Sequence, residues 1–157
     1  MKMSELAARV QKLEDIEAIK KLRAKYGYAV DEKRIDDVLA LFSEDAKLDF
    51  GPFDRYETPE GLKAFYGEKV PAMLPFSMHL VHNAIIEVEG EKGTGVWYIK
   101  IPATFGPTGE AIWTAGKYEE EYIKVKGEWK FSFIKFIVNF LTPYDAGWVK
   151  KPFIEAP

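Results

Sequence analysis

Four long stretches of β-forming residues in the second half of the sequence constrain its fold more than any other feature. They are residues 78–89, 94–105, 111–125 and 128–141. Each is rich in Ile, Val, Tyr, Phe or Trp, the residue types that favour strands. The turns between them contain glycine, at Gly90–Gly93, Gly106–Gly109 and Lys126–Gly127. Because short glycine turns join neighbouring antiparallel strands, the sequence predicts a curved antiparallel sheet of hairpins.

The first third of the chain predicts helices. Apolar residues recur at helical spacing at Leu6, Val10, Leu13, Ile16, Ile19 and Leu22. The other face of this helix is charged, with Glu14, Asp15, Lys20, Lys21 and Arg23. A second short helix is expected over residues 35–42 and a short strand over 46–50. A third helix opens at Thr58–Pro59, where Thr suits the N-cap and Pro the first turn, and is expected to end by Pro71.

Helices followed by strands predict a single α+β domain over residues 1–157, with the helices covering one face of the sheet. The space between the two layers is either filled by side chains or kept open as a pocket. The tail over residues 143–157 has no clear period and is expected to wrap the surface or to meet a partner subunit.

Composition excludes several classes of protein. The net charge is −3 and the basic residues form no stripe, so nucleic acid is not expected as a partner. No apolar run reaches the ~18 residues of a membrane span, and the N-terminus lacks the apolar stretch of a signal peptide, so a cytoplasmic location is expected. The absence of cysteine rules out disulfides, thiol nucleophiles and Cys-ligated metal.

Aromatic residues make up 15% of the chain, which is enough to line a cavity for a flat or polycyclic ligand as well as to fill a core. Strict alternation places Trp97, Ile99 and Ile101 on one face of their strand. In the last stretch the residues that share a face are Ile134, Phe136, Val138 and Phe140. Either set fits a plain core or a pocket wall.

The chain has two histidines, His79 and His82, within one short segment. Imidazole exchanges protons near neutrality, so each is a candidate general base. Asp31 follows the long helix and could orient an imidazole, or could instead cap the next helix. Because His79 and His82 are three residues apart, they point to opposite faces of a regular strand, and a β-bulge would exchange their directions.

Several segments resemble the SnoaL-like branch of the NTF2-like superfamily, which includes bile acid 7α-dehydratase, scytalone dehydratase and hexachlorocyclohexane dehydrochlorinase. The resemblance covers about residues 10 to 145 and is carried by Leu13–Tyr26, Asp31, Ser77–His79, Gly95–Tyr98, Tyr122, Gly127–Trp129 and Phe140–Tyr144. It implies a cone-shaped α+β barrel with a deep pocket, often assembled as a homotrimer. It also implies cofactor-free lyase chemistry, with His79 as base, Asp31 orienting it and Tyr26 bonding a substrate oxygen.

The chain departs from these relatives at two kinds of position. Ile101 stands where the bile acid enzyme has a second pocket Asp, and Val138 or Ile134 stands where relatives have an Arg. A charged bile acid is therefore disfavoured as substrate, and a less charged aromatic or alicyclic molecule is favoured. The expected substrate-binding residues are Trp97, Ile99, Ile101, Tyr118, Ile134 and Val138.

Other polar positions carry weaker functional signals. The acidic run Glu119–Glu121 is expected at a solvated edge, and Asn139 is expected to face away from the pocket. Two histidines three residues apart on a strand do not converge on a metal, so no metal site is expected. The favoured function is a cofactor-independent dehydratase. The alternatives are a double-bond isomerase, a formaldehyde-releasing carbon–carbon lyase and a non-catalytic binding module.

Overall fold

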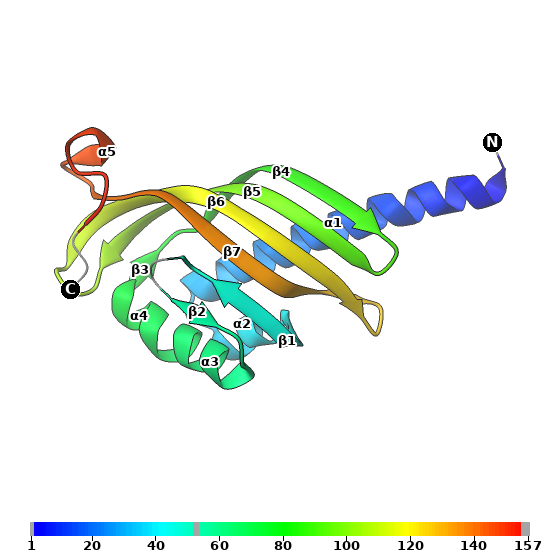
Figure 1. The fold of residues 1–157 in the computed structure, drawn as a ribbon, viewed down its shortest axis with the longest axis horizontal. Coiled ribbons are helices and arrows are strands. Elements are labelled where there is room, and N and C mark those ends of the chain that lie inside the picture. The colour runs from blue at the N-terminus through cyan, green and yellow to red at the C-terminus, as the bar shows by residue number, and fades with distance from the viewer. Residues whose placement is uncertain (1, 52–53, 155–157) are drawn as a thin grey trace.

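The computed structural model describes residues 2–51 and 54–154, and it is built around one strongly curved sheet (Figure 1). The strands of the described residues are β1 (Phe42–Asp49), β2 (Arg55–Tyr56), β3 (Phe76–Ser77), β4 (Leu80–Glu89), β5 (Lys92–Phe105), β6 (Glu110–Val125) and β7 (Glu128–Pro143). The helices are α1 (Met3–Asp31), α2 (Ile35–Leu39), α3 (Pro59–Ala64), the π-helical turn η1 (Phe65–Lys69), α4 (Val70–Met73) and α5 (Gly147–Lys150).

The sheet has the strand order β2-β1-β7-β6-β5-β3, and β4 also pairs with β5. Strands β4 to β7 form consecutive antiparallel hairpins, as predicted. Strand β1 instead runs parallel to β7, with Leu48 opposite Ile134, so the sheet is mixed. The prediction of an α+β fold with a curved sheet under N-terminal helices is confirmed. The described strands do not close into a barrel, because β2 lies at one end of the order and β3 at the other.

The hairpin turns lie where glycine was expected to place them. Gly90 and Gly109 have φ of 60° and 72°, and the Lys126–Gly127 turn has φ of 50° and 85°. Glycine adopts this left-handed region without the steric cost that a Cβ brings. The one large difference from the predicted strands is at residue 78. There the strand expected over residues 78–89 begins only at Leu80, as β4, and His79 lies in the break between β4 and the short strand β3.

Helix α1 runs along one face of the sheet, and its N-terminal half projects beyond the β4–β5 hairpin (Figure 1). The predicted apolar stripe is therefore buried only in its second half. Ile19 and Leu22 are in the core, whereas Val10 and Leu13 are exposed because no sheet lies under them. In the structure, no helix of the described residues is both long and apolar enough to cross a membrane.

Asp15 lies on the charged face of the predicted helix but is buried, since α1 passes over the β6–β7 hairpin. Its Oδ1 accepts hydrogen bonds from Lys124 Nζ at 2.5 Å and from Trp129 Nε1 at 2.9 Å. Burial raises the pKa of Asp15, but these two donors outweigh it and hold the pKa below its ordinary value of 3.8. The carboxylate ties the helix to the sheet.

The segment between α1 and the hairpins differs from its prediction at both ends. Strand β1 starts at Phe42 rather than Ala46, because its backbone pairs with β7 from Phe131 onward. Thr58 caps α3 as expected, accepting a hydrogen bond from the Gly61 amide at 3.1 Å. Helical structure does not end by Pro71. It continues through η1 and α4 to Met73, with Pro71 in the first turn of α4.

Two bulges in β7 decide which of its side chains face inward. The register of β6 and β7 shifts opposite Ala115–Gly116, where Asn139 is the extra residue, and shifts again opposite Glu121–Tyr122. Asn139 is exposed, as expected. Alternation predicted that Phe140 shares a face with Val138, and this prediction is wrong. The bulge at Asn139 lies between the two residues and reverses the alternation. Phe140 stacks on Trp148 with ring centroids 5.0 Å apart.

The tail folds back on the end of β7 instead of leaving the domain. After α5, the Leu141 amide donates to Pro152 O at 2.9 Å, and the Ile154 amide donates to Leu141 O at 2.8 Å. A parallel bridge between Leu141 and Phe153 results. The predicted contact of this tail with a partner subunit stays a prediction.

Replacing Asp15 by Ala is expected to lower the free energy of unfolding by about 2–3 kcal/mol. It removes two hydrogen bonds to a charged acceptor and leaves the buried Trp129 N–H without its partner. Urea unfolding at neutral pH measures the loss. Because the folded pKa of Asp15 is lowered, its contribution is present above pH 3.8 and is lost as the pH falls through the folded value. The control, Glu14→Ala on the exposed face, is expected to change stability by less than about 0.5 kcal/mol.

Candidate active site

A cavity of about 310 Å³ lies between the C-terminal half of α1, the η1–α4 segment and the inner face of β5, β6 and β7. Its wall is mainly apolar: Val30, Phe50, Phe65, Val70, Met73, Leu74, Ile101, Ala103, Phe105, Ile112, Phe136, Val138, Leu141 and Ile154. Five polar side chains interrupt this wall: Tyr26, Tyr66, His79, Thr114 and Tyr118. Apolar walls with a few placed polar groups are typical of small-molecule sites, and the volume is near the lower limit of their usual range of about 300–1,000 Å³.

The structure brings some of the predicted substrate-binding residues to this cavity and buries the others beside it. Ile101, Tyr118 and Val138 line the wall. Trp97, Ile99 and Ile134 are buried in the core but are not among the lining residues. Alternation correctly gives the face of the sheet, but it does not say how far along that face the cavity extends.

Asp31 and His79, which are 48 residues apart in the chain, are joined by two hydrogen bonds. Asp31 Oδ1 lies 2.6 Å from His79 Nδ1, and Oδ2 accepts from the His79 backbone amide at 2.8 Å. Ser77 Oγ adds a third bond to Oδ1 at 2.8 Å. The His79 side chain is 6% exposed and lines the cavity, whereas Asp31 lies behind it.

The electrostatics of the pair favour a neutral imidazole beside an ionised carboxylate. Burial raises the pKa of Asp31, but the bonds from His79 and Ser77 outweigh it and leave the pKa below its ordinary value. Burial lowers the pKa of His79 below 6.5, although the Asp31 charge opposes that fall. An ionised Asp31 accepts the Nδ1 proton, so the lone pair of the imidazole is on Nε2. That nitrogen is the one available to a bound molecule as a base.

Local structure explains why the two groups meet. Helix α1 ends at Asp31, and Lys33 follows it in the left-handed region with φ of 57°. The turn leaves the Asp31 carboxylate at the helix end, directed toward the break between β3 and β4. The break itself is held by a hydrogen bond from the Met78 amide to Pro102 O at 3.1 Å. His79 is therefore fixed at a point where it belongs to neither strand.

His82, the alternative base, lies outside the cavity. It is exposed in β4, where it pairs with Tyr98 of β5. A bulge does occur in this strand, but the register shift follows His82 rather than separating the two histidines. Geometry therefore places His79, and not His82, against the cavity.

Tyr26 meets a partner that the sequence did not reveal. Its hydroxyl lies 2.9 Å from the hydroxyl of Tyr66, and both tyrosines line the cavity. The Tyr26 ring also packs edge-on against His79, with ring centroids 6.3 Å apart. Burial raises the pKa of both phenols, so both are neutral hydrogen-bond donors at neutral pH. In the sequence Tyr66 is an aromatic residue within the third expected helix, and the helical pattern does not distinguish it from a core residue.

A buried ion pair lies beside these phenols. Arg23 and Glu120 are both almost fully buried, and Arg23 Nε lies 3.3 Å from Glu120 Oε1. Both were misplaced by the sequence analysis, which put Arg23 on the charged face of α1 and Glu120 at a solvated edge. They are buried because the helix crosses β6 where Glu120 points inward. Burial lowers the pKa of Arg23, but the charge of Glu120 outweighs it and raises that pKa.

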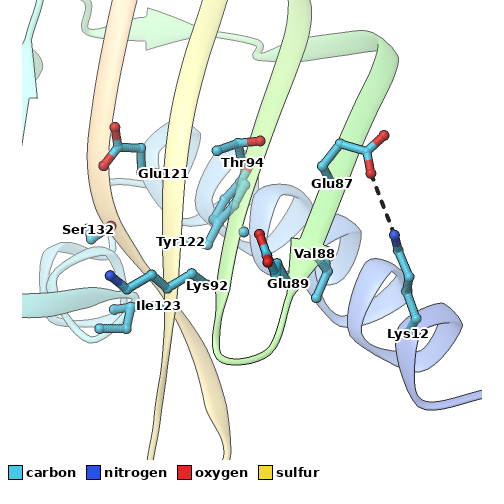
Figure 2. A pocket seen from close by; sticks show the side chains of 11 residues that line it. Lys12, Glu87, Val88, Glu89, Lys92, Thr94, Glu121, Tyr122, Ile123 and Ser132 are labelled. Carbon is cyan, nitrogen blue, oxygen red and sulfur yellow. Dashed lines mark ion pairs between the residues drawn. The ribbon is translucent and has the colours of Figure 1, made fainter. Parts of the chain in front are cut away.

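A second hollow, larger and more open, lies at the other end of the sheet (Figure 2). It has a volume of about 630 Å³, and charged residues form its rim. At one side of it Lys12 of α1 pairs with Glu87 of β4, with Nζ 3.6 Å from Oε2. Neither histidine lies there. Among the described residues, no three His, Cys, Asp or Glu side chains gather closely enough to hold a metal ion.

A family model described as a SnoaL-like domain matches residues 11–135. The chain belongs to the SnoaL-like domain family. That span includes Tyr26, Asp31, Tyr66, His79 and Tyr118.

Solved structures with the same fold cover most of the chain. A hexachlorocyclohexane dehydrochlorinase (LinA) of type 2 is 23% identical, with a TM-score of 0.82 over 95% of this chain and 98% of that one. A protein assigned as a scytalone dehydratase from Novosphingobium aromaticivorans is 21% identical, with a TM-score of 0.77 over 84% and 89%. An NTF2-like protein with a cystatin-like fold from the same species is 20% identical, with a TM-score of 0.71 over 95% and 94%. These similarities confirm the predicted fold.

Replacing Asp31 by Asn is expected to lower the pKa of His79 further, because Asp31 is the group that raises it against burial. The imidazole of the variant therefore stays neutral to a lower pH than in the wild type. An NMR titration of the two imidazoles measures this shift, and the exposed His82 is the internal control. A His79 titration that is identical in the two proteins would contradict the proposed coupling.

Proposed function

We propose that this protein is a lyase of the dehydratase type that acts on an uncharged hydroxylated cyclic or aromatic ketone and needs no cofactor. One observation carries the proposal: His79, held by Asp31, lines a mainly apolar cavity together with two hydrogen-bonded phenols. The dehydrochlorinase and dehydratase names of the similar structures agree with elimination chemistry.

In the proposed reaction, His79 Nε2 takes a proton from the carbon next to a substrate carbonyl. The electron pair of that C–H bond moves onto the carbonyl oxygen, which becomes an enolate oxygen. Asp31 keeps the imidazole oriented and stabilises it once it is protonated. Tyr26, supported by Tyr66, donates a hydrogen bond to the oxygen that gains charge, and Tyr118 is a further donor at the wall.

The leaving group is a hydroxyl on the next carbon. When the enolate collapses to form the carbon–carbon double bond, the C–O bond breaks and the oxygen takes a proton to leave as water. Of the described lining residues, His79 is the only one with an imidazole, and burial raises the pKa of the phenols that line the cavity with it, so they hold their protons more tightly. The proton that Nε2 removed is therefore the one returned to the departing oxygen.

The same observation favours double-bond isomerisation as a second candidate. A single base without a second acid at Ile101 can return its proton to another carbon of the substrate, and no leaving group is then required. Mass spectrometry of the product separates the two reactions, because dehydration removes one molecule of water and isomerisation leaves the mass unchanged. The predicted homotrimer and cytoplasmic location stay predictions.

Replacing His79 by Ala is expected to reduce kcat/KM for such a ketone by about 10²–10⁴-fold, the usual contribution of a general base. Hydroxylated cyclic ketones are incubated with the protein, and loss of water is followed by mass spectrometry. His82→Ala is the matched control and is expected to retain wild-type turnover, since that side chain lies outside the cavity. Turnover that survives in His79→Ala would sink the proposal.

A further inference from the structure

A positive charge lies directly behind two of the phenols that line the cavity. The guanidinium carbon of Arg23 is 4.5 Å from the ring centroid of Tyr26 and 4.1 Å from that of Tyr118. Both tyrosines face the cavity, whereas Arg23 is not among its lining residues. A ligand in the cavity would therefore contact the two tyrosines and not the guanidinium itself.

This charge has few partners of its own. None of the three guanidinium nitrogens makes a hydrogen bond to a described residue, and the ion pair with Glu120 is its one close opposite charge among them. The other oxygen of Glu120 accepts a hydrogen bond from Tyr122, whose hydroxyl also accepts one from Trp97 Nε1 at 3.0 Å. Buried ion pairs of this kind contribute little or nothing to stability compared with apolar side chains of similar volume. Stability is thus a weak reason for a guanidinium here.

The two charges of the pair act on the phenols in opposite directions. Burial raises the pKa of Tyr26 and of Tyr118, the Arg23 charge opposes that rise, and the Glu120 charge adds to it. The hydroxyls of Tyr26 and Tyr66 lie 2.9 Å apart and either can donate to the other, so Tyr66 can donate to Tyr26 when Tyr26 donates its own proton to a ligand oxygen. A negative oxygen bonded to Tyr26 or Tyr118 is stabilised by the same cation.

We propose that Arg23 is a positioning residue for the reaction. Its guanidinium, placed behind the rings of Tyr26 and Tyr118, makes this end of the cavity a site for an anionic oxygen on a ring, such as an enolate or a phenolate. The inference rests on the proposed function, because the enolate of that reaction is the anion to be stabilised. Arg23 would thus supply a positive charge near the cavity. Ile134 and Val138, which stand where relatives have an Arg, supply none.

The test uses a pair of ligands and needs no substrate. Binding of 4-nitrophenolate, at a pH above the ionisation of the free phenol, is compared by calorimetry with binding of 4-nitroanisole, its uncharged methyl ether. Arg23→Met is expected to weaken phenolate binding about tenfold, the equivalent of one pKa unit, and Glu120→Gln is expected to strengthen it several-fold. Arg23→Lys, which keeps the charge, is expected to restore most of the affinity. Binding of 4-nitroanisole is expected to stay within about twofold throughout.

The two substitutions are expected to change phenolate affinity in opposite directions, and this difference separates an electrostatic role of Arg23 from a structural one. If Arg23 only supports the fold, then both Arg23→Met and Glu120→Gln weaken both ligands, and that result overturns the proposal. So does a wild-type protein that fails to bind the phenolate at millimolar concentration. Should Arg23→Met not fold, the double variant Arg23→Met/Glu120→Gln removes both charges and is still expected to weaken the phenolate. In a His79→Ala background, phenolate binding is still expected to depend on Arg23, although turnover is lost. The role of Arg23 and the proposed lyase function can therefore be disproved independently of each other.

Discussion

The hydrogen bonds between Asp31 and His79 connect the end of a helix to a break in a sheet, and the geometry of the cavity depends on them. Asp31 binds both the ring and the backbone of His79, so the imidazole cannot rotate without losing a bond to the carboxylate. The same carboxylate accepts from Ser77, which anchors β3. One side chain therefore sets the tautomer of the base and the position of the break between β3 and β4 that carries it.

Much of this arrangement could be predicted from the sequence, because glycine turns and alternation are local signals. The hairpins, the burial of Ile101 and Tyr118, and the pairing of Asp31 with one of two histidines all follow from such signals or from the family resemblance. Arg23, Glu120 and Asp15 were missed because charge is normally a surface signal, and their burial depends on where α1 crosses the sheet. Tyr66 was missed because its partner, Tyr26, is 40 residues away.

The site combines a mainly apolar wall with a small number of polar side chains. Three tyrosines contribute neutral phenols to this wall, and a buried ion pair, Arg23 with Glu120, lies beside them. In an apolar enclosure such charges act over longer distances than in water. The cavity can thus receive an uncharged molecule and still favour a negative oxygen that appears only during a reaction.

The bulge at Asn139 has a consequence for how this family of pockets can change. Upstream of it Val138 lines the cavity, and downstream Leu141 does so, while Phe140 turns outward to Trp148. Deleting that single residue would exchange the inward and outward side chains over the whole end of β7. A one-codon length change could therefore replace part of the wall at once, which no single substitution achieves.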